Sequence, residues 1–191
     1  SADELLNQAL RYRAYWKNGG GITVSGGEPL LQIDFLLEFF KKAKEKGIHT
    51  VIDTAGGPFT REEPFFSKFQ ELMKYTDLLL ADIKHIDTEC HKTLTGRGNE
   101  NILDMIRYLS DTKKPIWIRH VLVPERSDKD EYLTRLADFI HSLNNVEKVE
   151  ILPYHTMGIY KWKELGLDYP LEGINPPTKE RVENAKKILT I

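Results

Sequence analysis

Residues 22–29 read ITVSGGEP, a short β-rich run that ends in two glycines, a glutamate and a proline. Isoleucine, threonine and valine favour a strand, and a glycine pair followed by proline marks a turn. The apolar residues that come next recur at helical spacing, which predicts one buried helix face. They are Leu36, Phe39, Phe40 and Ala43. This stretch therefore predicts a strand, a glycine turn and a helix, in that order.

The same strand-then-helix unit recurs along the chain. Further strands are predicted at residues 50–52, 78–81, 116–118 and 149–152, with helices between them whose apolar residues keep helical spacing. The helix positions expected to be buried are Phe65, Phe69, Leu72, Ile102, Met105, Ile106, Leu109, Leu133, Leu136, Ala137, Ile140, Val182, Ala185 and Leu189. Strands separated by helices imply a parallel sheet, either an open doubly wound sheet or a barrel. Both architectures place their chemistry at the carboxyl ends of the strands.

Helix boundaries agree with this order of elements. Gly47 follows a lysine-rich last turn and is expected to end one helix. Asp128 with Glu131 resembles a capping box that opens another helix, and residues 176–178, Pro-Pro-Thr, are expected to begin the last one.

Composition sets limits on the kind of protein. The 27 Lys and Arg nearly cancel the 29 Asp and Glu, so the formal charge of -2 draws the chain neither to nucleic acid nor to an anionic membrane. With 191 residues, a single domain over residues 1–191 is expected. No apolar run of membrane-spanning length and no signal pattern is present, which favours a cytoplasmic location. The one cysteine, Cys90, excludes a disulfide or a cysteine cluster within these residues.

The chain opens on a predicted helix that contains Leu5, Leu6, Ala9 and Leu10, with no strand before it. We therefore expect an N-terminal strand and its loop to be missing. The expected fold is α/β, a partial TIM-like barrel with parallel strands, in which five strand-helix units follow an initial helix.

Charged or glycine-rich residues follow the first two predicted strands. Gly26 and Gly27 let a ligand approach the backbone closely, and the Glu28 carboxylate is a candidate acceptor for an ammonium group. Asp53 and Thr54 end the second strand, where a barrel enzyme presents polar groups. The alternatives are an ordinary turn at the glycines and a helix cap or turn at Asp53.

The next three strands end in the same way. Strand alternation places Asp82 and Lys84 on one face. In the fourth strand it places Trp117, Arg119 and Val121 on one face and Ile116, Ile118 and His120 on the other. The planar guanidinium of Arg119 is suited to a carboxylate or to ribose oxygens. His155 follows the fifth strand. An internal ion pair of Lys84 or Arg119 with Asp82, and a solvated loop histidine, are the alternatives. The convergence of five strand ends favours a binding rim for a ligand with ammonium, carboxylate and hydroxyl groups.

An ordered series of motifs resembles the glycyl-radical-enzyme activating enzymes of the radical S-adenosylmethionine superfamily. The motifs run over nearly the whole chain. They lie at residues 19–28, 47–50, 53–54, 82–84, 117–119, 123–124, 145–148 and 152–155, and at Gly158, Lys161, Trp162, Gly173 and residues 176–177.

The resemblance implies an activity, cofactors and partners. S-adenosylmethionine at a [4Fe-4S] cluster would yield a 5'-deoxyadenosyl radical, which takes hydrogen from a glycine of a glycyl-radical enzyme, here expected to be pyruvate formate-lyase. An electron donor such as flavodoxin or ferredoxin is also implied. The cluster would exist only in the full-length protein, because the family's C-x-x-x-C-x-x-C loop is absent from these residues. The fragment alone is therefore expected to be inactive.

The resemblance also implies roles for single residues. Gly26, Gly27 and Glu28 would hold the methionine amino end, and Asp82, Lys84, Arg119 and His155 would contact the carboxylate and ribose. Asp53, Thr54 and Asp82 match positions that hold a monovalent cation. Residues 154–166 match a segment near which the partner's glycine loop docks.

Two residues depart from the family's usual pattern. Ala55 stands where the family often has asparagine, and Glu125 stands where it commonly has glycine. Cys90 is predicted to be non-catalytic, because adjacent Cys90 and His91 do not face each other on a helix.

Two alternative functions stay open at this point. One is a barrel enzyme that uses Lys84 as a Schiff-base amine, which the nearby Asp82 disfavours by keeping the amine charged. The other is a cysteine-free binding or scaffold protein that shares the fold.

Overall fold

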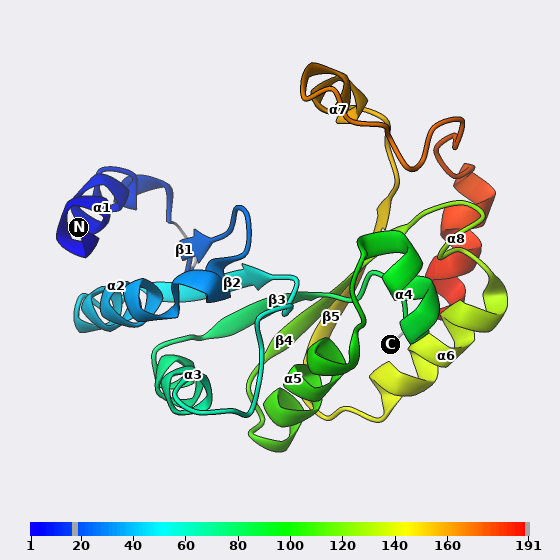
Figure 1. The fold of residues 1–191 in the computed structure, drawn as a ribbon. Coiled ribbons are helices and arrows are strands. Elements are labelled where there is room, and N and C mark those ends of the chain that lie inside the picture. The colour runs from blue at the N-terminus through cyan, green and yellow to red at the C-terminus, as the bar shows by residue number, and fades with distance from the viewer. Residues whose placement is uncertain (17–18, 190–191) are drawn as a thin grey trace. The chain divides into compact units, whose positions relative to one another are not determined.

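The computed structural model describes residues 1–16 and 19–189, and it places the predicted strands in one five-stranded sheet (Figure 1). The strands are β1 (Gly21–Val24), β2 (His49–Thr54), β3 (Leu78–Asp82), β4 (Ile116–Leu122) and β5 (Val146–Pro153). They lie in chain order, and the β1–β2 and β2–β3 pairs are parallel. A doubly wound sheet reverses its strand order at a switch point. The observed order is therefore that of a (β/α) barrel, and the fold-class prediction is confirmed.

Every predicted helix is present, and two unpredicted α-helices and two unpredicted short 3-10 helices also occur among the described residues. The helices are α1 (Ala2–Leu10), η1 (Arg13–Tyr15), η2 (Pro29–Gln32), α2 (Ile33–Glu45), α3 (Phe65–Lys74), α4 (Thr88–Thr95), α5 (Glu100–Asp111), α6 (Asp130–His141), α7 (Ile159–Glu164) and α8 (Lys179–Ile188). Sequence periodicity missed α4 and α7, because neither has an apolar face long enough to repeat. Within the described residues, none of the helices has the length and apolar character required to span a membrane.

Helix ends confirm two of the three predicted boundaries. Gly47 has φ +68° after the end of α2, and the Thr178 side chain accepts a hydrogen bond from the Arg181 N–H at the start of α8. The predicted capping box at Asp128 is wrong. Lys129 is the N-cap of α6 and makes no side-chain cap, because the Asp128 carboxylate binds the Glu125 N–H instead.

The chain packs as two compact units. Unit 1 comprises residues 1–82, 100–118 and 143–148, and unit 2 comprises residues 83–99, 119–142 and 149–191.

Unit 1 has a core of aliphatic and aromatic side chains beneath β1 to β3. Helix α2 packs against α1, α3 and β2 (Figure 1). The side chains that are fully buried here include Phe39, Phe40, Ile52, Phe69, Leu72, Leu79, Met105 and Ile106. Burying a side chain of this size contributes roughly 1.5–3 kcal/mol, so this core stabilises the strand ends of unit 1.

Strand β4 shows the predicted alternation. Ile116, Ile118, His120 and Leu122 are buried, and the residues between them are half-buried. In unit 2, His120 Nδ1 lies 2.8 Å from the Ile83 carbonyl oxygen and Nε2 lies 3.4 Å from that of Ser127. Neutral imidazole has one N–H, so the shorter contact to Ile83 is the better-formed hydrogen bond.

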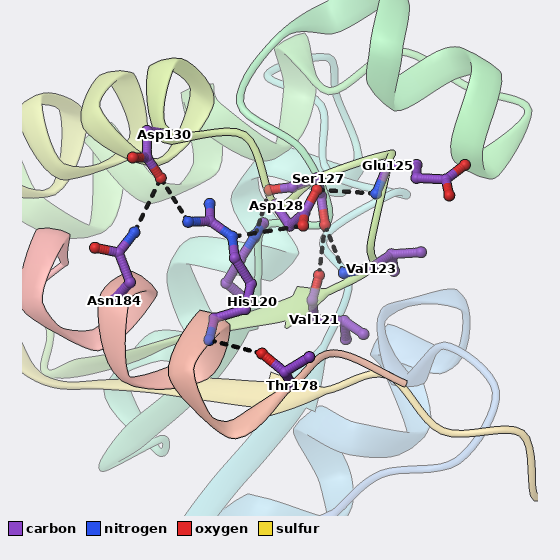
Figure 2. A network of polar contacts seen from close by, with 10 residues as sticks. His120, Val121, Val123, Glu125, Ser127, Asp128, Asp130, Thr178 and Asn184 are labelled. Carbon is purple, nitrogen blue, oxygen red and sulfur yellow. Dashed lines mark hydrogen bonds and ion pairs between the residues drawn. The ribbon is translucent and has the colours of Figure 1, made fainter. Parts of the chain in front are cut away.

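The β4–α6 loop, residues 123–129, is closed by hydrogen bonds of Ser127 (Figure 2). The fully buried Ser127 hydroxyl donates to the Val121 carbonyl at 2.8 Å and accepts from the Val123 N–H at 3.0 Å. These bonds hold the loop against the end of β4.

Helix α8 holds the far side of the same loop. Arg181 pairs with Asp130 at 2.6 Å and with Asp128 at 3.5 Å, and Asn184 donates to Asp130 at 3.0 Å (Figure 2). Helices α6 and α8 are in contact. The loop therefore has polar anchors on both β4 and α8.

The buried imidazole of His120 predicts a pH dependence of stability. Burial lowers its pKa from the ordinary 6.5, and the charges of His85 and Lys84 act in the same direction against the two carbonyl hydrogen bonds. The unfolded chain therefore takes up a proton first as the pH falls through about 6.5, and stability present above that pH is lost below it. We expect a loss of about 1 kcal/mol per pH unit in that window.

Urea unfolding at about pH 7.5 and pH 5.5 measures this effect. His120→Asn removes one titrating ring and should reduce the dependence to the part that comes from His85, whose pKa burial also lowers, whereas the exposed His49→Asn should leave it unchanged. An equal pH dependence in all three proteins would show that His120 is not responsible.

Candidate functional site

The turn after β1 is built for close approach to its backbone. Gly26 and Gly27 have φ values of +89° and +56°, which L side chains adopt at a cost of roughly 1–2 kcal/mol. A Cβ atom placed on either residue would meet no atom within 4 Å. The glycines are thus required by the backbone conformation, and the space above them is open.

The Glu28 carboxylate joins the ends of β1 and β2. Its Oε1 accepts hydrogen bonds from the Leu30 N–H at 3.0 Å and the Thr54 hydroxyl at 2.6 Å, and its Oε2 accepts from the Ala55 N–H at 2.9 Å. Hydrogen bonds to a charged group are worth about 1.5–3 kcal/mol. We call this set of three hydrogen bonds the Glu28 clamp. It fixes the glycine turn against the β2 end.

The Glu28 clamp bears on the role predicted for this carboxylate. The sequence suggested that it accepts hydrogen bonds from a ligand ammonium group, but both of its oxygens already accept from the chain. The carbonyl groups of Gly26 and Gly27, in contrast, make no hydrogen bond within the described residues. The turn therefore offers backbone oxygens, with Glu28 as the residue that positions them.

Acidic residues end β2 and β3 in unit 1. Asp53 is half-buried, and Asp82 is 9% exposed. Asp53 pairs in register with Leu80, so Asp53 and Asp82 share a face of the sheet. Both carboxylates interact with other residues of the chain.

Thr54 faces the other side of the strand. It is 2% exposed, and its hydroxyl accepts from the Gly56 N–H at 2.8 Å while it donates to Glu28. The described residues contain no cluster of three His, Cys, Asp or Glu side chains able to hold a metal. A cation between Asp53 and Asp82 would be bound by these two carboxylates. The Thr54 hydroxyl would not be one of its ligands, because it faces the other side of the strand.

Lys84 and Arg119 are neighbours in unit 2. The Ile83 N–H donates to the Arg119 carbonyl at 2.9 Å, which aligns the residues after β3 with β4. Both side chains are half-buried and interact with other groups. Arg119 lies on the half-buried face of β4 together with Val121, which strand alternation also predicts for that face but which was not among the predicted site residues.

His155 is exposed and lines an open pocket of about 420 Å³ with Val121, Leu152, Pro153 and Tyr154. The Tyr154 N–H donates to the Leu122 carbonyl at 3.1 Å, which ties this segment to the end of β4. The Tyr154 hydroxyl shares a 2.7 Å hydrogen bond with Tyr169. Burial and that bond raise the pKa of Tyr169 to about 12, so the Tyr169 phenol stays neutral near neutral pH.

Each unit therefore has its own chemistry. Unit 1 offers an open glycine turn and two carboxylates, which suit an ammonium group or a cation. Unit 2 offers an ammonium, a guanidinium and an imidazole beside an aromatic wall, which suit a carboxylate, hydroxyl groups and an apolar ring.

Known proteins resemble this chain over most of its length. The sequence model of the radical SAM superfamily matches residues 1–137. A pyruvate formate-lyase-activating enzyme of Listeria monocytogenes is 54% identical over 190 residues, which cover 99% of this chain and 77% of that protein. One from Streptococcus mutans is 53% identical over 189 residues, covering 99% and 72%.

Solved structures give the same result. The crystal structure of a domain of a pyruvate-formate lyase-activating enzyme from Bacteroides vulgatus has a TM-score of 0.72 at 30% identity, covering 90% of this chain and 94% of that one. A radical SAM methyltransferase from Sphaerobacter thermophilus, 18% identical with a TM-score of 0.67 over 98% of this chain and 53% of that one, shares the fold.

Removal of the Glu28 charge tests the Glu28 clamp. Glu28→Gln keeps the size of the side chain but turns an amide N–H₂ toward backbone or hydroxyl donors, so we expect a loss of about 1–3 kcal/mol of stability. The exposed Glu45→Gln on α2 should change stability by less than about 0.5 kcal/mol. Urea unfolding of the three proteins measures both. Equal stabilities of Glu28→Gln and the parent would contradict the Glu28 clamp.

Proposed function

The chain belongs to the pyruvate formate-lyase-activating enzymes of the radical SAM superfamily, and from that membership we propose that it supplies the S-adenosylmethionine-binding wall of a glycyl-radical activase. The observation that carries the proposal is 54% identity over 99% of the chain. The open glycine turn of this chain supports it. When bound at a [4Fe-4S] cluster, S-adenosylmethionine supplies the radical that takes hydrogen from the partner's glycine. Pyruvate formate-lyase is the proposed partner.

The described residues fit one of these two groups and not the other. A [4Fe-4S] cluster is held by cysteine thiolates, and these 191 residues contain one cysteine. Cys90 lies on α4, where its thiol contacts the Tyr132 hydroxyl at 3.5 Å. These residues alone therefore do not form the cluster site. We infer that the cluster requires cysteines outside these residues.

S-adenosylmethionine fits the polar groups at the strand ends. We propose that the carbonyl groups of Gly26 and Gly27 accept hydrogen bonds from the methionine ammonium, with the Glu28 clamp holding them in place. Lys84 and Arg119 are proposed to bind the carboxylate and the ribose. His155, beside the apolar pocket of Val121 and Leu152, is proposed to contact the nucleoside. Binding in a fixed orientation is the contribution that a protein makes to cofactor chemistry.

A monovalent cation is a second proposal for the same region. Asp53 and Asp82 share a face of the sheet. A cation between them would offset the repulsion of their carboxylates and of the methionine carboxylate of S-adenosylmethionine. Thr54 would contribute indirectly, through the hydrogen bond that its hydroxyl donates to Glu28 in the Glu28 clamp. The electron donor, flavodoxin or ferredoxin, and the cytoplasmic location stay predictions.

The two alternatives lose support. A Schiff-base enzyme requires an uncharged amine at Lys84, and the 52–54% identical relatives are activating enzymes, not aldolases or scaffolds.

Iron reconstitution tests the assignment. We expect the 191-residue chain, mixed anaerobically with iron and sulfide, to give no stoichiometric [4Fe-4S] absorbance. A longer product of the same gene that carries three spaced cysteines should give it. That product, with S-adenosylmethionine, a reductant and pyruvate formate-lyase, should produce a glycyl-radical signal in electron paramagnetic resonance.

Cys90→Ser in the longer product is the matched control, and it should keep both iron content and radical yield. A stoichiometric cluster on the 191 residues, or its loss in Cys90→Ser, would contradict the assignment of Cys90. A full cluster without any glycyl radical would contradict the proposed partner.

A further inference from the structure

Unit 2 contains a pocket of about 270 Å³ that the proposed function does not use. It lies between α4, the β4–α6 loop, the start of α6 and residues 170–171. Leu94 and Leu171 give it an apolar wall, and Arg126 and Lys129 bring cationic groups to it. None of its residues belongs to the set proposed to bind S-adenosylmethionine.

The pocket is rich in hydrogen-bond donors. The Lys129 ammonium lies 5.8 Å from the centre of the Tyr132 ring, and the Tyr132 hydroxyl accepts from the Cys90 thiol, which leaves the phenolic hydrogen available to donate. Arg126 adds an exposed guanidinium to the lining. The one carboxylate in the lining is that of Glu125, which is exposed.

A buried donor without a well-formed hydrogen bond lines the same pocket. His85 is 1% exposed and packs edge-to-face on Tyr132 at 4.4 Å between ring centres. Its Nδ1 accepts from the Asp87 N–H at 2.9 Å, so the neutral ring carries its proton on Nε2. The Arg126 backbone interacts with the ring, but that Nε2 makes no hydrogen bond of good geometry with the described residues. Buried donors are almost always well paired, so this one has capacity for a ligand or water.

The wall of the pocket is strained and preformed. Glu125 has φ +63°, a conformation that favours glycine, and it stands where the resembling family usually has glycine. Asp128 accepts from the Glu125 N–H at 2.9 Å, and Arg181 holds Asp128 from α8 (Figure 2). The polar network that closes the loop thus also fixes Glu125 and Arg126 at the pocket. Preorganisation of this kind lowers the entropy cost of binding.

We propose that this pocket binds a small organic carboxylate with a short apolar body. Two cationic groups against one carboxylate, together with neutral donors, favour an anion. The apolar wall favours a ligand that is more than a bare inorganic ion. The volume lies just below the roughly 300–1,000 Å³ of common ligand pockets, which excludes a nucleotide.

Butyrate is the probe for this site, titrated into the ¹⁵N-labelled chain and followed by amide and imidazole NMR shifts. We expect saturable shifts at the pocket residues, including the His85 ring. Butyramide, which is uncharged and of the same shape, should bind about tenfold more weakly or worse, and so should inorganic phosphate. The titration needs neither cluster nor S-adenosylmethionine, so its result is independent of the proposed function.

Two variants separate the site from general charge. Arg126→Gln with Lys129→Gln should weaken butyrate binding about tenfold or more. Lys92→Gln removes one charge from the exposed side of α4, outside the pocket, and should leave the affinity unchanged. Thermal unfolding of each variant confirms that it is folded. Absent shifts with butyrate, equal binding of butyramide, tighter binding of phosphate, or an unchanged affinity in the double variant would each overturn the proposal.

Discussion

The Glu28 carboxylate is the contact on which the proposed ligand site of unit 1 depends. One side chain accepts hydrogen bonds from the start of η2, from the Thr54 hydroxyl and from the Ala55 backbone. Because those donors belong to η2, which follows the glycine turn, and to the carboxyl end of β2, the carboxylate fixes the shape of the turn at Gly26 and Gly27. A left-handed glycine pair has many other conformations available, so an uncharged residue at this position would leave the turn undefined.

In unit 2, buried hydrogen bonds fix the position of the proposed ligand-binding residues. The residues of unit 2 that are proposed to contact the ligand lie on or beside β4, and buried polar groups hold the end of that strand in place. His120 binds the Ile83 carbonyl, and Ser127 closes the following loop onto Val121 and Val123. Helix α8 then anchors the loop through the ion pair of Arg181 with Asp128.

Local sequence patterns predicted the strands, most helices and the positions of the polar residues at the strand ends. Alternation along β4 correctly separated Arg119 from His120. Helix α4 was missed because its recognisable signals are its ends, Asp87 and Gly96, and not an apolar stripe. The partner of a side chain was the least predictable feature. Asp128 looked like a helix cap, but it binds Glu125 and Arg181, and Arg181 is distant in sequence.

The role of Glu28 could not be read from the sequence for the same reason. A carboxylate beside two glycines suggests a ligand contact, and only the fold brings Thr54 and Ala55 to it. The strain at Glu125 was likewise hidden, since a φ value follows from the loop's hydrogen bonds and not from its residue types.

The most direct test of this account is a calorimetric titration of S-adenosylmethionine into the 191-residue chain, its Glu28→Gln variant and its Glu45→Gln control. The account predicts weak saturable binding by the parent chain and the control, and binding about tenfold weaker or lost in Glu28→Gln while that variant remains folded. The same affinity for all three proteins, or no saturable binding by the parent chain, would contradict it.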